Sequence, residues 1–210
     1  MFVIVNKPHG LLVHSTDSSS EYTLRDFLIE NFNITKVGDS EREGIVHRLD
    51  RVTSGLMICP ISSEAFNQLQ KDFKNRKIKK KYKAIVQGFL NSKTGEINLP
   101  LIHSQTNRRK REVGKNGREA ITIYKTISKT DSYTLLDIDL LTGRNHQIRA
   151  HFEYLKTPIV NDILYGAKKV NELDQNTICL QSYNIEFKLF DKDYKFSINE
   201  PDYFTSIMNM

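Results

Sequence analysis

Two alternating stretches in the second half of the chain place the strongest constraint on its fold. Ala120–Ile127 and Tyr133–Leu141 alternate apolar and polar side chains, and five residues separate them. A period of two puts the apolar side chains on one face of a half-buried strand, so the pattern predicts antiparallel strands joined by a short turn. Ile178–Ile198, near the end of the chain, alternates in the same way.

Helical patterns interrupt these strands at irregular intervals. Apolar residues follow helical spacing in Thr23–Asn31, from Ser63 onward, and across Arg144–Leu155. Because no regular strand–helix–strand repeat is present, the sequence predicts an α+β class with a mixed, mainly antiparallel sheet flanked by helices. Shorter apolar stretches that predict further strands are Phe2–Val5, Gly55–Ile58 and Tyr82–Val86, and Ser18–Ser20 is expected as a loop.

Length and composition indicate a single domain over residues 1–210, because 39% of the residues are hydrophobic and 27% are charged. No apolar run approaches the roughly 20 residues of a membrane span. Met1–Pro8 enters a strand-like stretch without the basic and apolar regions of a signal peptide. Cys59 and Cys179 are too few for a disulfide framework. We therefore expect a cytoplasmic monomer with no membrane partner.

Basic residues concentrate in two short segments. Lys71–Lys83 holds eight Lys and Arg residues against one Asp, and Arg108–Arg118 holds six against one Glu. Because the whole chain carries only +6, the remainder is net acidic. Such concentrated charge is typical of contact with a phosphate backbone. A solvated helix end followed by a charged loop would give the same pattern.

Several common catalytic motifs are absent from the sequence, among them the phosphate loop, the dinucleotide-binding glycine motif and the helical zinc motif. His146 and His151 are five residues apart, which puts them on different faces of a helix. His9, His14 and His103 fall in expected loops without an acidic cluster. We therefore expect no metal ion and no cofactor.

A polar turn at Gly44–Leu56 contains Asp50 between Arg48 and Arg51. Nearby positive charges favour the ionised carboxylate, which can act as a nucleophile or a base. An ordinary ion pair in a loop is the alternative interpretation.

Two further stretches combine basic and aromatic residues or hydrogen-bond donors. Lys79–Gly88 places Tyr82 in a basic strand, which suits stacking on a nucleobase beside phosphates, although a strand tyrosine is commonly a core residue. Leu140–Phe152 contains a turn that opens a helix. If Ile148 is in the core, Arg149 faces the sheet edge; otherwise it is a surface arginine.

In their order and spacing, these stretches resemble the catalytic motifs of the RluA-type pseudouridine synthases. Asn145 stands where that family usually has Thr, and Asn161 where Gly is usual, which could alter a turn. The N-terminal S4-like domain of some members has no counterpart here, so we expect a stand-alone catalytic domain. The matching segments are Asn6–Gly10, His47–Asp50, Thr53–Leu56, Lys81–Ala84, Gly143–Arg149, Pro158–Asp162 and Tyr165–Gly166.

The resemblance implies an isomerase that converts specific uridines in structured ribosomal or transfer RNA to pseudouridine. It implies that Asp50 is the catalytic carboxylate, that Tyr82 packs on the uracil ring and that Arg149 pairs with Asp50. A stacked uridine must be extruded to reach the carboxylate, and Arg48 either fills the vacated space or is a second ion-pair partner. Arg144 and His146 are expected to be turn and core hydrogen-bonding groups. The candidate RNA-binding residues are Arg48, Lys79, Lys80, Lys81, Arg108, Arg109, Lys110 and Arg111.

Two other functions stay open at this point. One is an RNA-binding module without catalysis, against which the intact set of Asp50, Tyr82 and Arg149 argues. The other is a metal-free RNA hydrolase, which would release uracil or cleave strands instead of forming an isomer. The sequence does not identify the target uridine, and it does not say whether Asp50 attacks the ribose or removes a proton from it.

Overall fold

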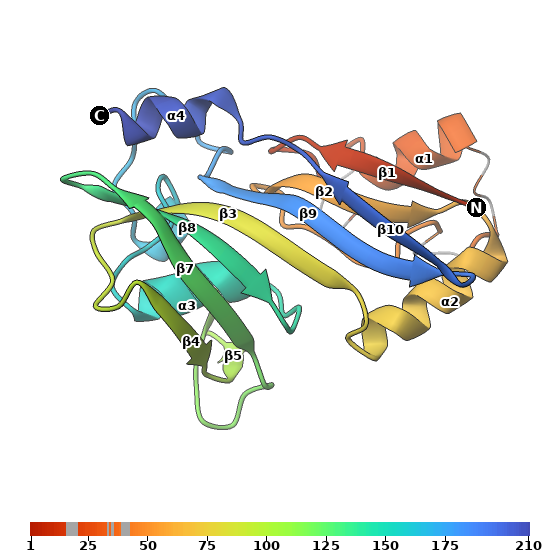
Figure 1. Cartoon of the computed structure of the whole chain (residues 1–210), viewed down its shortest axis with the longest axis horizontal. Helices are drawn as coiled ribbons and strands as arrows, with labels where there is room; N and C mark the ends of the chain where they lie inside the picture. The colour runs from red at the N-terminus through yellow and green to blue at the C-terminus, as the bar shows by residue number, and fades with distance from the viewer. Residues whose placement is uncertain (16–20, 33, 35, 39–42) are drawn as a thin grey trace. The chain divides into compact units, whose positions relative to one another are not determined.

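A computed structural model describes residues 1–15, 21–32, 34, 36–38 and 43–210, so the expected Ser18–Ser20 loop lies outside the described part. Contacts divide the chain into two compact units. Unit 1 comprises residues 1–79 and 184–198, and unit 2 comprises residues 80–183 and 199–210. A single catalytic domain over residues 1–210 stays a prediction. The helices and strands are coloured along the chain in Figure 1.

In unit 1, β1 (Phe2–Lys7) pairs antiparallel with β2 (Ser54–Pro60), with Phe2 opposite Pro60 and Lys7 opposite Gly55. Every residue of β2 is buried, as expected for a strand covered on both faces. The helices of this unit are α1 (Leu24–Phe32) and α2 (Ser63–Lys74).

Helix α2 begins where Ser62 caps it, since the Ser62 side chain accepts a hydrogen bond from the Ala65 amide. Its buried residues Ala65 and Leu69 join a core cluster with Leu56 and Ile58 of β2. The part of β9 (Leu180–Leu189) that lies in unit 1 adds Ile185, Phe187 and Leu189 to this cluster and pairs antiparallel with β10 (Lys192–Ser197).

Unit 2 contains an antiparallel sheet in the order β3–β8–β7–β4. The alternating stretches predicted from the sequence form β7 (Ile121–Lys129) and β8 (Tyr133–Leu140), with a bulge between Thr126 and Ser128. The other members are β3 (Lys79–Gln87) and β4 (Thr94–Asn98), and a separate two-stranded ribbon joins β5 (Leu101–His103) to β6 (Arg111–Val113).

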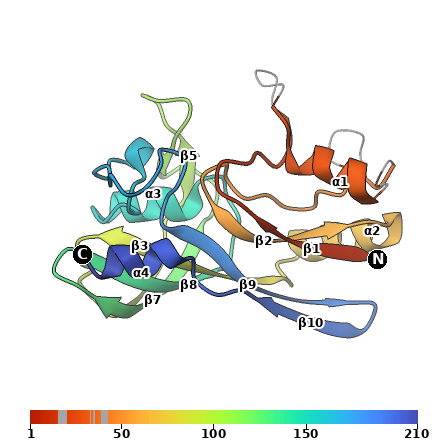
Figure 2. The same cartoon turned by 90° about the horizontal axis from the view of Figure 1, so that it is seen from above.

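Helix α3 (Gln147–Tyr154) covers one face of this sheet (Figures 1 and 2). The Tyr124 ring of β7 contacts Phe152 of α3 at a centroid distance of 5.9 Å. On β3, Ile85 joins a second cluster with Phe204 and Ile207 of α4 (Asp202–Met208). A 3-10 turn at Ile163–Tyr165 follows α3.

The predicted α+β class with a mainly antiparallel sheet is confirmed. Helix α3 begins at Gln147 and not at the predicted Arg144, because His146 adopts a left-handed conformation with φ of 55°. Neither α4 nor the short strands β4, β5 and β6 were predicted. No helix in the described part of the chain is long and apolar enough to cross a membrane.

Candidate active site

A buried lysine organises the loop that carries Asp50 in unit 1. The ammonium of Lys7, at the end of β1, is fully buried and donates hydrogen bonds to the carbonyl oxygens of Pro8, Leu11 and Arg51 at 2.8, 2.9 and 3.3 Å. Burial lowers the pKa of Lys7 to about 8, while attraction to Asp50 acts in the opposite direction. The positive charge of Lys7 therefore favours an ionised carboxylate at position 50.

The segment before Asp50 is held by side chains and backbone. The Nε2 atom of His47 accepts a hydrogen bond from the Ile58 amide at 2.9 Å, and the His47 ring stacks on Phe73 of α2. After the aspartate, the Thr53 amide donates to the Asp50 carbonyl oxygen at 3.1 Å. These contacts fix the turn on both sides of Asp50, which itself is half-buried.

Arg48, two residues before Asp50, has an exposed side chain whose Nη1 lies 3.2 Å from Nε2 of His14. Arg51 points elsewhere and forms a two-point ion pair with Glu21, at 3.1 and 2.7 Å. The two arginines near Asp50 in the sequence therefore differ: Arg51 is held by a carboxylate, whereas Arg48 contacts an imidazole nitrogen.

In unit 2, α3 buries Arg149, which is 4% exposed. Its Nε and Nη2 donate to the Oδ2 and Oδ1 atoms of Asp162 at 2.7 and 2.9 Å. Its guanidinium carbon lies 4.8 Å from the centre of the Tyr165 ring. A surface position for Arg149 is thus excluded, and the predicted pairing of Arg149 with Asp50 stays a prediction.

Tyr165 connects α3 to the second basic segment. Its hydroxyl accepts a hydrogen bond from the Arg111 amide at 2.9 Å and lies 2.9 Å from Nδ1 of His146. The Lys110 ammonium lies 4.9 Å from the ring centre and forms an ion pair with Glu153 of α3. Lys110 and Arg111 are therefore held against the helix that carries Arg149.

Gln147, the first residue of α3, joins the helix start to β7. The Oε1 atom of its side chain accepts hydrogen bonds from the Thr142 hydroxyl and the Arg144 backbone amide. The Nε2 atom of the same side chain donates to the Ile121 backbone carbonyl and the Thr122 hydroxyl, both at 3.0 Å. The Arg144 side chain donates to the Glu119 carbonyl at 2.9 Å. These contacts agree with the expected turn role of Arg144.

Tyr82 is buried in β3, where it stands opposite Ile138 of β8. Alternation along the strand puts Lys80 on the same face as Tyr82. The Lys80 ammonium lies beside Gly143, in the turn before α3. A Cβ atom built on Gly143 would lie 3.3 Å from the Lys80 Nζ atom. Burial lowers the pKa of Lys80 to about 8. Lys80 thus belongs to the face of β3 that carries the predicted catalytic tyrosine.

Lys81 points to the other face of β3, where its ammonium lies 3.6 Å from Asp137 and 3.3 Å from Asp139. Burial lowers the pKa of Lys81, but the hydrogen bond to Asp139 and the attraction of both carboxylates outweigh it and raise the pKa. Three consecutive lysines therefore have different surroundings: Lys79 is exposed, Lys80 lies beside Gly143, and Lys81 is paired with carboxylates.

Arg108 and Arg109 are exposed in the loop between β5 and β6. Arg111, at the start of β6, lies 2.6 Å from Nδ1 of His103 through its Nη1 atom. The four basic candidates of this segment thus divide into two exposed arginines and two residues anchored on neighbouring groups. Whether any of them contacts RNA stays a prediction.

The departures from the family pattern have simple structural outcomes. Asn161 adopts a left-handed conformation with φ of 64°, which glycine adopts freely and Asn tolerates. Its side-chain amide donates to the carbonyls of Asp174 and Thr177, and its oxygen accepts from the Val170 amide. The turn at this position is therefore kept and tied to the following loop. Asn145 is exposed.

Sequence reasoning did not assign roles to Lys7, Asp162 or Tyr165. Lysine and aspartate are rarely buried, so the pattern alone places them at the surface. One feature of the sequence could have indicated that Lys7 is buried: it lies at the end of an apolar strand and directly before a proline. Among the described residues, no group of three or more His, Cys, Asp or Glu side chains is arranged to hold a metal ion.

Comparison with known proteins identifies the family. The family model for RNA pseudouridylate synthases matches residues 1–154. Ribosomal large subunit pseudouridine synthase D of Borreliella burgdorferi is 36% identical over 202 residues, which cover 94% of this chain and 62% of that relative. An uncharacterized RNA pseudouridine synthase of Aquifex aeolicus is 34% identical over 215 residues, covering 97% of this chain and 68% of the relative.

Solved structures show the same fold. The chain superposes on human RNA Pseudouridylate Synthase Domain Containing 4 with a TM-score of 0.77 and 23% identity, covering 97% of this chain and 87% of the other. The chain spans about half to two thirds of the length of the curated relatives that it matches. The resemblance to RluA-type enzymes noted in the sequence is confirmed, and the chain belongs to the RNA pseudouridylate synthase family.

Proposed function

We propose that this chain is an RNA pseudouridine synthase that isomerises specific uridines in structured RNA. One observation carries the proposal: the motifs of Asp50, Tyr82 and Arg149 all lie within residues 1–154, which match the family model. The proposed enzyme needs neither a metal ion nor an organic cofactor, and we expect it to act as a monomer.

The reaction breaks the bond between the uracil N1 and the ribose, turns the base and joins C5 to the same ribose carbon. N1 gains a proton and C5 loses one, so the product is an isomer and no water is consumed. A glycoside hydrolase usually needs two carboxylates, because one protonates the leaving group and the other attacks or activates water. Uracil can leave as a delocalised anion and stays bound, so the single carboxylate of Asp50 suffices.

Asp50 must be ionised whether it attacks the ribose or removes a ribose proton. The attraction between Lys7 and Asp50 supports this state. Arg149 would add a second positive charge if it pairs with Asp50 as proposed. Tyr82 would pack on the uracil ring, which needs a rigid aromatic side chain, and its buried position in β3 supports this role.

The target uridine must leave the RNA stack before it can reach Asp50. Arg48 is proposed to occupy the space that the base leaves, because its side chain is exposed and lies only two residues before the catalytic aspartate. Arg48 contacts His14, and among the residues that the structure describes no carboxylate pairs with its guanidinium, where it would compete with the RNA.

Ribosomal RNA is the proposed substrate, because a relative that is 36% identical carries the name ribosomal large subunit pseudouridine synthase. The experiment is incubation of ribosomal and transfer RNA with the purified protein, followed by mapping of pseudouridine with carbodiimide. We expect new pseudouridine in ribosomal RNA. If pseudouridine formed in transfer RNA alone, transfer RNA and not ribosomal RNA would be the substrate.

The decisive variant is Asp50→Asn, which keeps the size of the side chain and removes its charge. It should form no pseudouridine while it binds RNA with nearly unchanged affinity. Asp131→Asn, at an exposed position in the loop between β7 and β8, is the matched control and should keep full activity. An active Asp50→Asn enzyme, or release of free uracil by the wild type, would contradict the proposal.

A further inference from the structure

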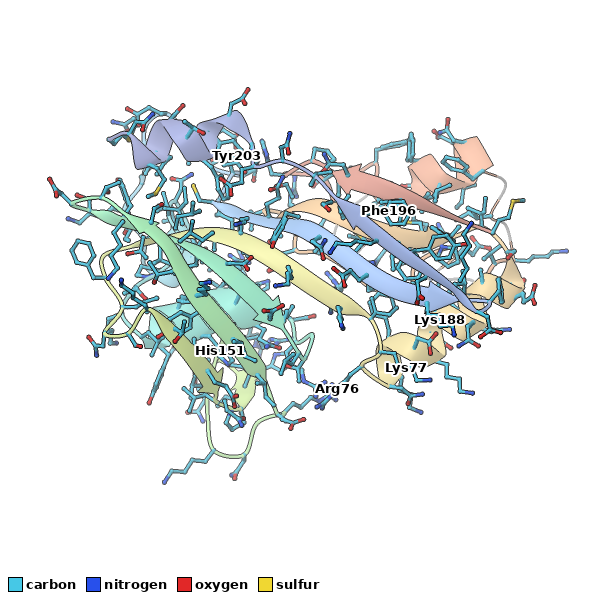
Figure 3. All side chains as sticks on the ribbon, in the orientation of Figure 1. Arg76, Lys77, His151, Lys188, Phe196 and Tyr203 are labelled. Carbon is cyan, nitrogen blue, oxygen red and sulfur yellow. The ribbon has the colours of Figure 1, made fainter. Side chains whose placement is uncertain are left out.

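A hollow of about 350 Å³ lies in unit 1, formed by the turn after α2, the first residue of β3 and the β9–β10 hairpin. Two of its residues, Lys77 and Lys188, are labelled in Figure 3. None of the predicted catalytic residues lines it. The hollow is lined by Lys77, Lys79, Glu186, Phe187, Lys188, Asp193, Tyr194 and Lys195.

Lysines outnumber carboxylates in this hollow by four to two. The hairpin places them alternately, since Lys195 stands opposite Glu186 and Asp193 stands opposite Lys188. The Lys195 ammonium lies 2.8 Å from Glu186. Among the residues that the structure describes, no carboxylate forms an ion pair with Lys79. The lining therefore keeps a net positive charge after its internal ion pair is counted.

The remaining ion pairs around the hollow are weak. Lys188 pairs with Asp191 at 3.2 Å and Lys77 with Asp72 at 3.9 Å, and more than half of each lysine side chain is exposed. Exposed pairs of this kind contribute little stability, so an external anion can replace the carboxylates at small cost. The ammonium groups of Lys77, Lys79 and Lys188 are then available to one polyanionic ligand.

Stacked aromatic rings hold the two strands of the hairpin together. The rings of Phe187 and Tyr194 lie 5.2 Å apart with an interplanar angle of 19°, and Phe2 packs edge-on against both of them. Because these rings hold one another in place, the hairpin is formed before any ligand binds, which limits the entropy lost on binding. Strand alternation puts the rings on one face of the hairpin and the Lys188 and Lys195 side chains on the other.

We propose that this hollow binds the phosphodiester backbone of the substrate RNA at a place other than the target uridine. The inference rests on the proposed function, which supplies an RNA ligand. Separate flexible lysines act as point charges and fit several phosphates without reading sequence, whereas a single bound phosphate is better served by a rigid fork of donors. The site adds Lys188, which belongs to neither basic segment of the sequence.

The test is the salt dependence of RNA binding by the triple variant Lys77→Gln, Lys79→Gln and Lys188→Gln. Each phosphate contact contributes about 0.7 to 0.9 to the slope of log Kd against log salt, so the slope should fall by about 2. At moderate salt the Kd for ribosomal RNA should rise about tenfold, and the change should appear in KM more than in kcat. Thermal unfolding of the variant checks that the protein is folded.

Lys192→Gln is the matched control, because Lys192 lies on the same hairpin but is not among the residues that line the hollow. Its ammonium lies over the Tyr194 ring, on the opposite face of the hairpin from Lys188. The control should keep the wild-type slope. An unchanged slope in the triple variant, or an equal loss in the control, would overturn the inference. Failure of the wild type to form pseudouridine would instead count against the proposed function, since the slope is measured without catalysis.

Discussion

Arg149 and Asp162 form a two-point ion pair in unit 2, with nitrogen–oxygen distances of 2.7 and 2.9 Å. Both side chains are buried, and the Tyr165 ring lies against the guanidinium. Since two of the three guanidinium nitrogens are aligned by one carboxylate, Asp162 sets the plane of Arg149. Asp162 is therefore a positioning residue for an arginine that we propose acts in catalysis.

Asp162→Asn should weaken both stability and catalysis. It leaves a buried guanidinium without its countercharge, and breaking a buried pair in this way costs about 3 kcal/mol of unfolding free energy. Because misplacement of a catalytic group by about 1 Å can cost 100-fold in rate, we expect kcat to fall by about that factor while KM for RNA changes little. Urea denaturation and single-turnover assays would measure these effects.

Arg149→Lys separates charge from geometry in the same pair. Lysine keeps the charge but cannot form the two parallel hydrogen bonds, so it should reproduce most of the loss in kcat. A fully active Arg149→Lys enzyme would show that the alignment by Asp162 is not needed. Asp131→Asn, at an exposed position, serves again as the carboxylate control.

The sequence predicted the strands β7 and β8 well, because an alternation of period two with a short turn has few other structural solutions. It predicted the start of α3 less well, since nothing in the sequence marks His146 as left-handed. The pairing of Arg149 with Asp162 joins residues 13 positions apart through a loop and a turn, and such contacts depend on tertiary structure that periodicity does not describe.

The sequence grouped Lys79, Lys80 and Lys81 as candidate RNA-binding residues of one basic segment. On a strand, however, consecutive side chains point to opposite faces, so a run of three lysines cannot form a single patch. The division of the three lysines between two faces could have been predicted once the strand was extended back to Lys79.

The burial of Lys7 could not have been predicted from the sequence. An ammonium group enters the interior only where several carbonyl groups converge on it, and that convergence is a property of the tertiary structure.

Lys7→Met should destabilise unit 1 and change its response to alkaline pH. Three carbonyl oxygens lose their charged donor, which costs about 2–4 kcal/mol of unfolding free energy. In the wild type the pKa of Lys7 is about 8, below the ordinary 10.5. The unfolded chain therefore binds more protons between pH 8 and 10.5, and stability rises with pH in this window.

The variant should lose part of that rise, while Lys80, whose pKa is also lowered to about 8, supplies the other part. Urea denaturation from pH 7.5 to 10.5 would measure the difference between the two proteins. Lys169→Met changes an exposed lysine and should follow the wild type throughout. An identical pH profile for Lys7→Met would show that Lys7 does not titrate at a lowered pKa.

His151 should make the protein less stable in mild acid. It is fully buried, with Nδ1 2.9 Å from the Thr122 hydroxyl and Nε2 3.0 Å from the Leu99 carbonyl, and burial lowers its pKa below 6.5. As the pH falls below 6.5, the unfolded chain takes up a proton that the folded protein resists, so stability decreases by up to about 1.4 kcal/mol per pH unit.

His151→Gln should flatten this decrease, although it lowers stability at neutral pH. The comparison is made by chemical denaturation between pH 5 and 7.5. His103→Gln, which replaces an exposed histidine in β5, should retain the wild-type dependence. If His151→Gln lost stability with acid as steeply as the wild type, the buried imidazole would not be the source.

Tyr165→Phe should affect RNA binding more than the chemical step. The change removes the hydroxyl that accepts the Arg111 amide and contacts His146, but it keeps the ring that packs on Arg149. An unsatisfied buried amide costs about 1–3 kcal/mol, and the basic segment loses its anchor on the Tyr165 hydroxyl. We therefore expect a higher KM for RNA with kcat reduced much less.

Tyr154→Phe, on the exposed face of α3, is the matched control and should change neither constant. A fall in kcat with unchanged KM would show instead that the hydroxyl acts through Arg149.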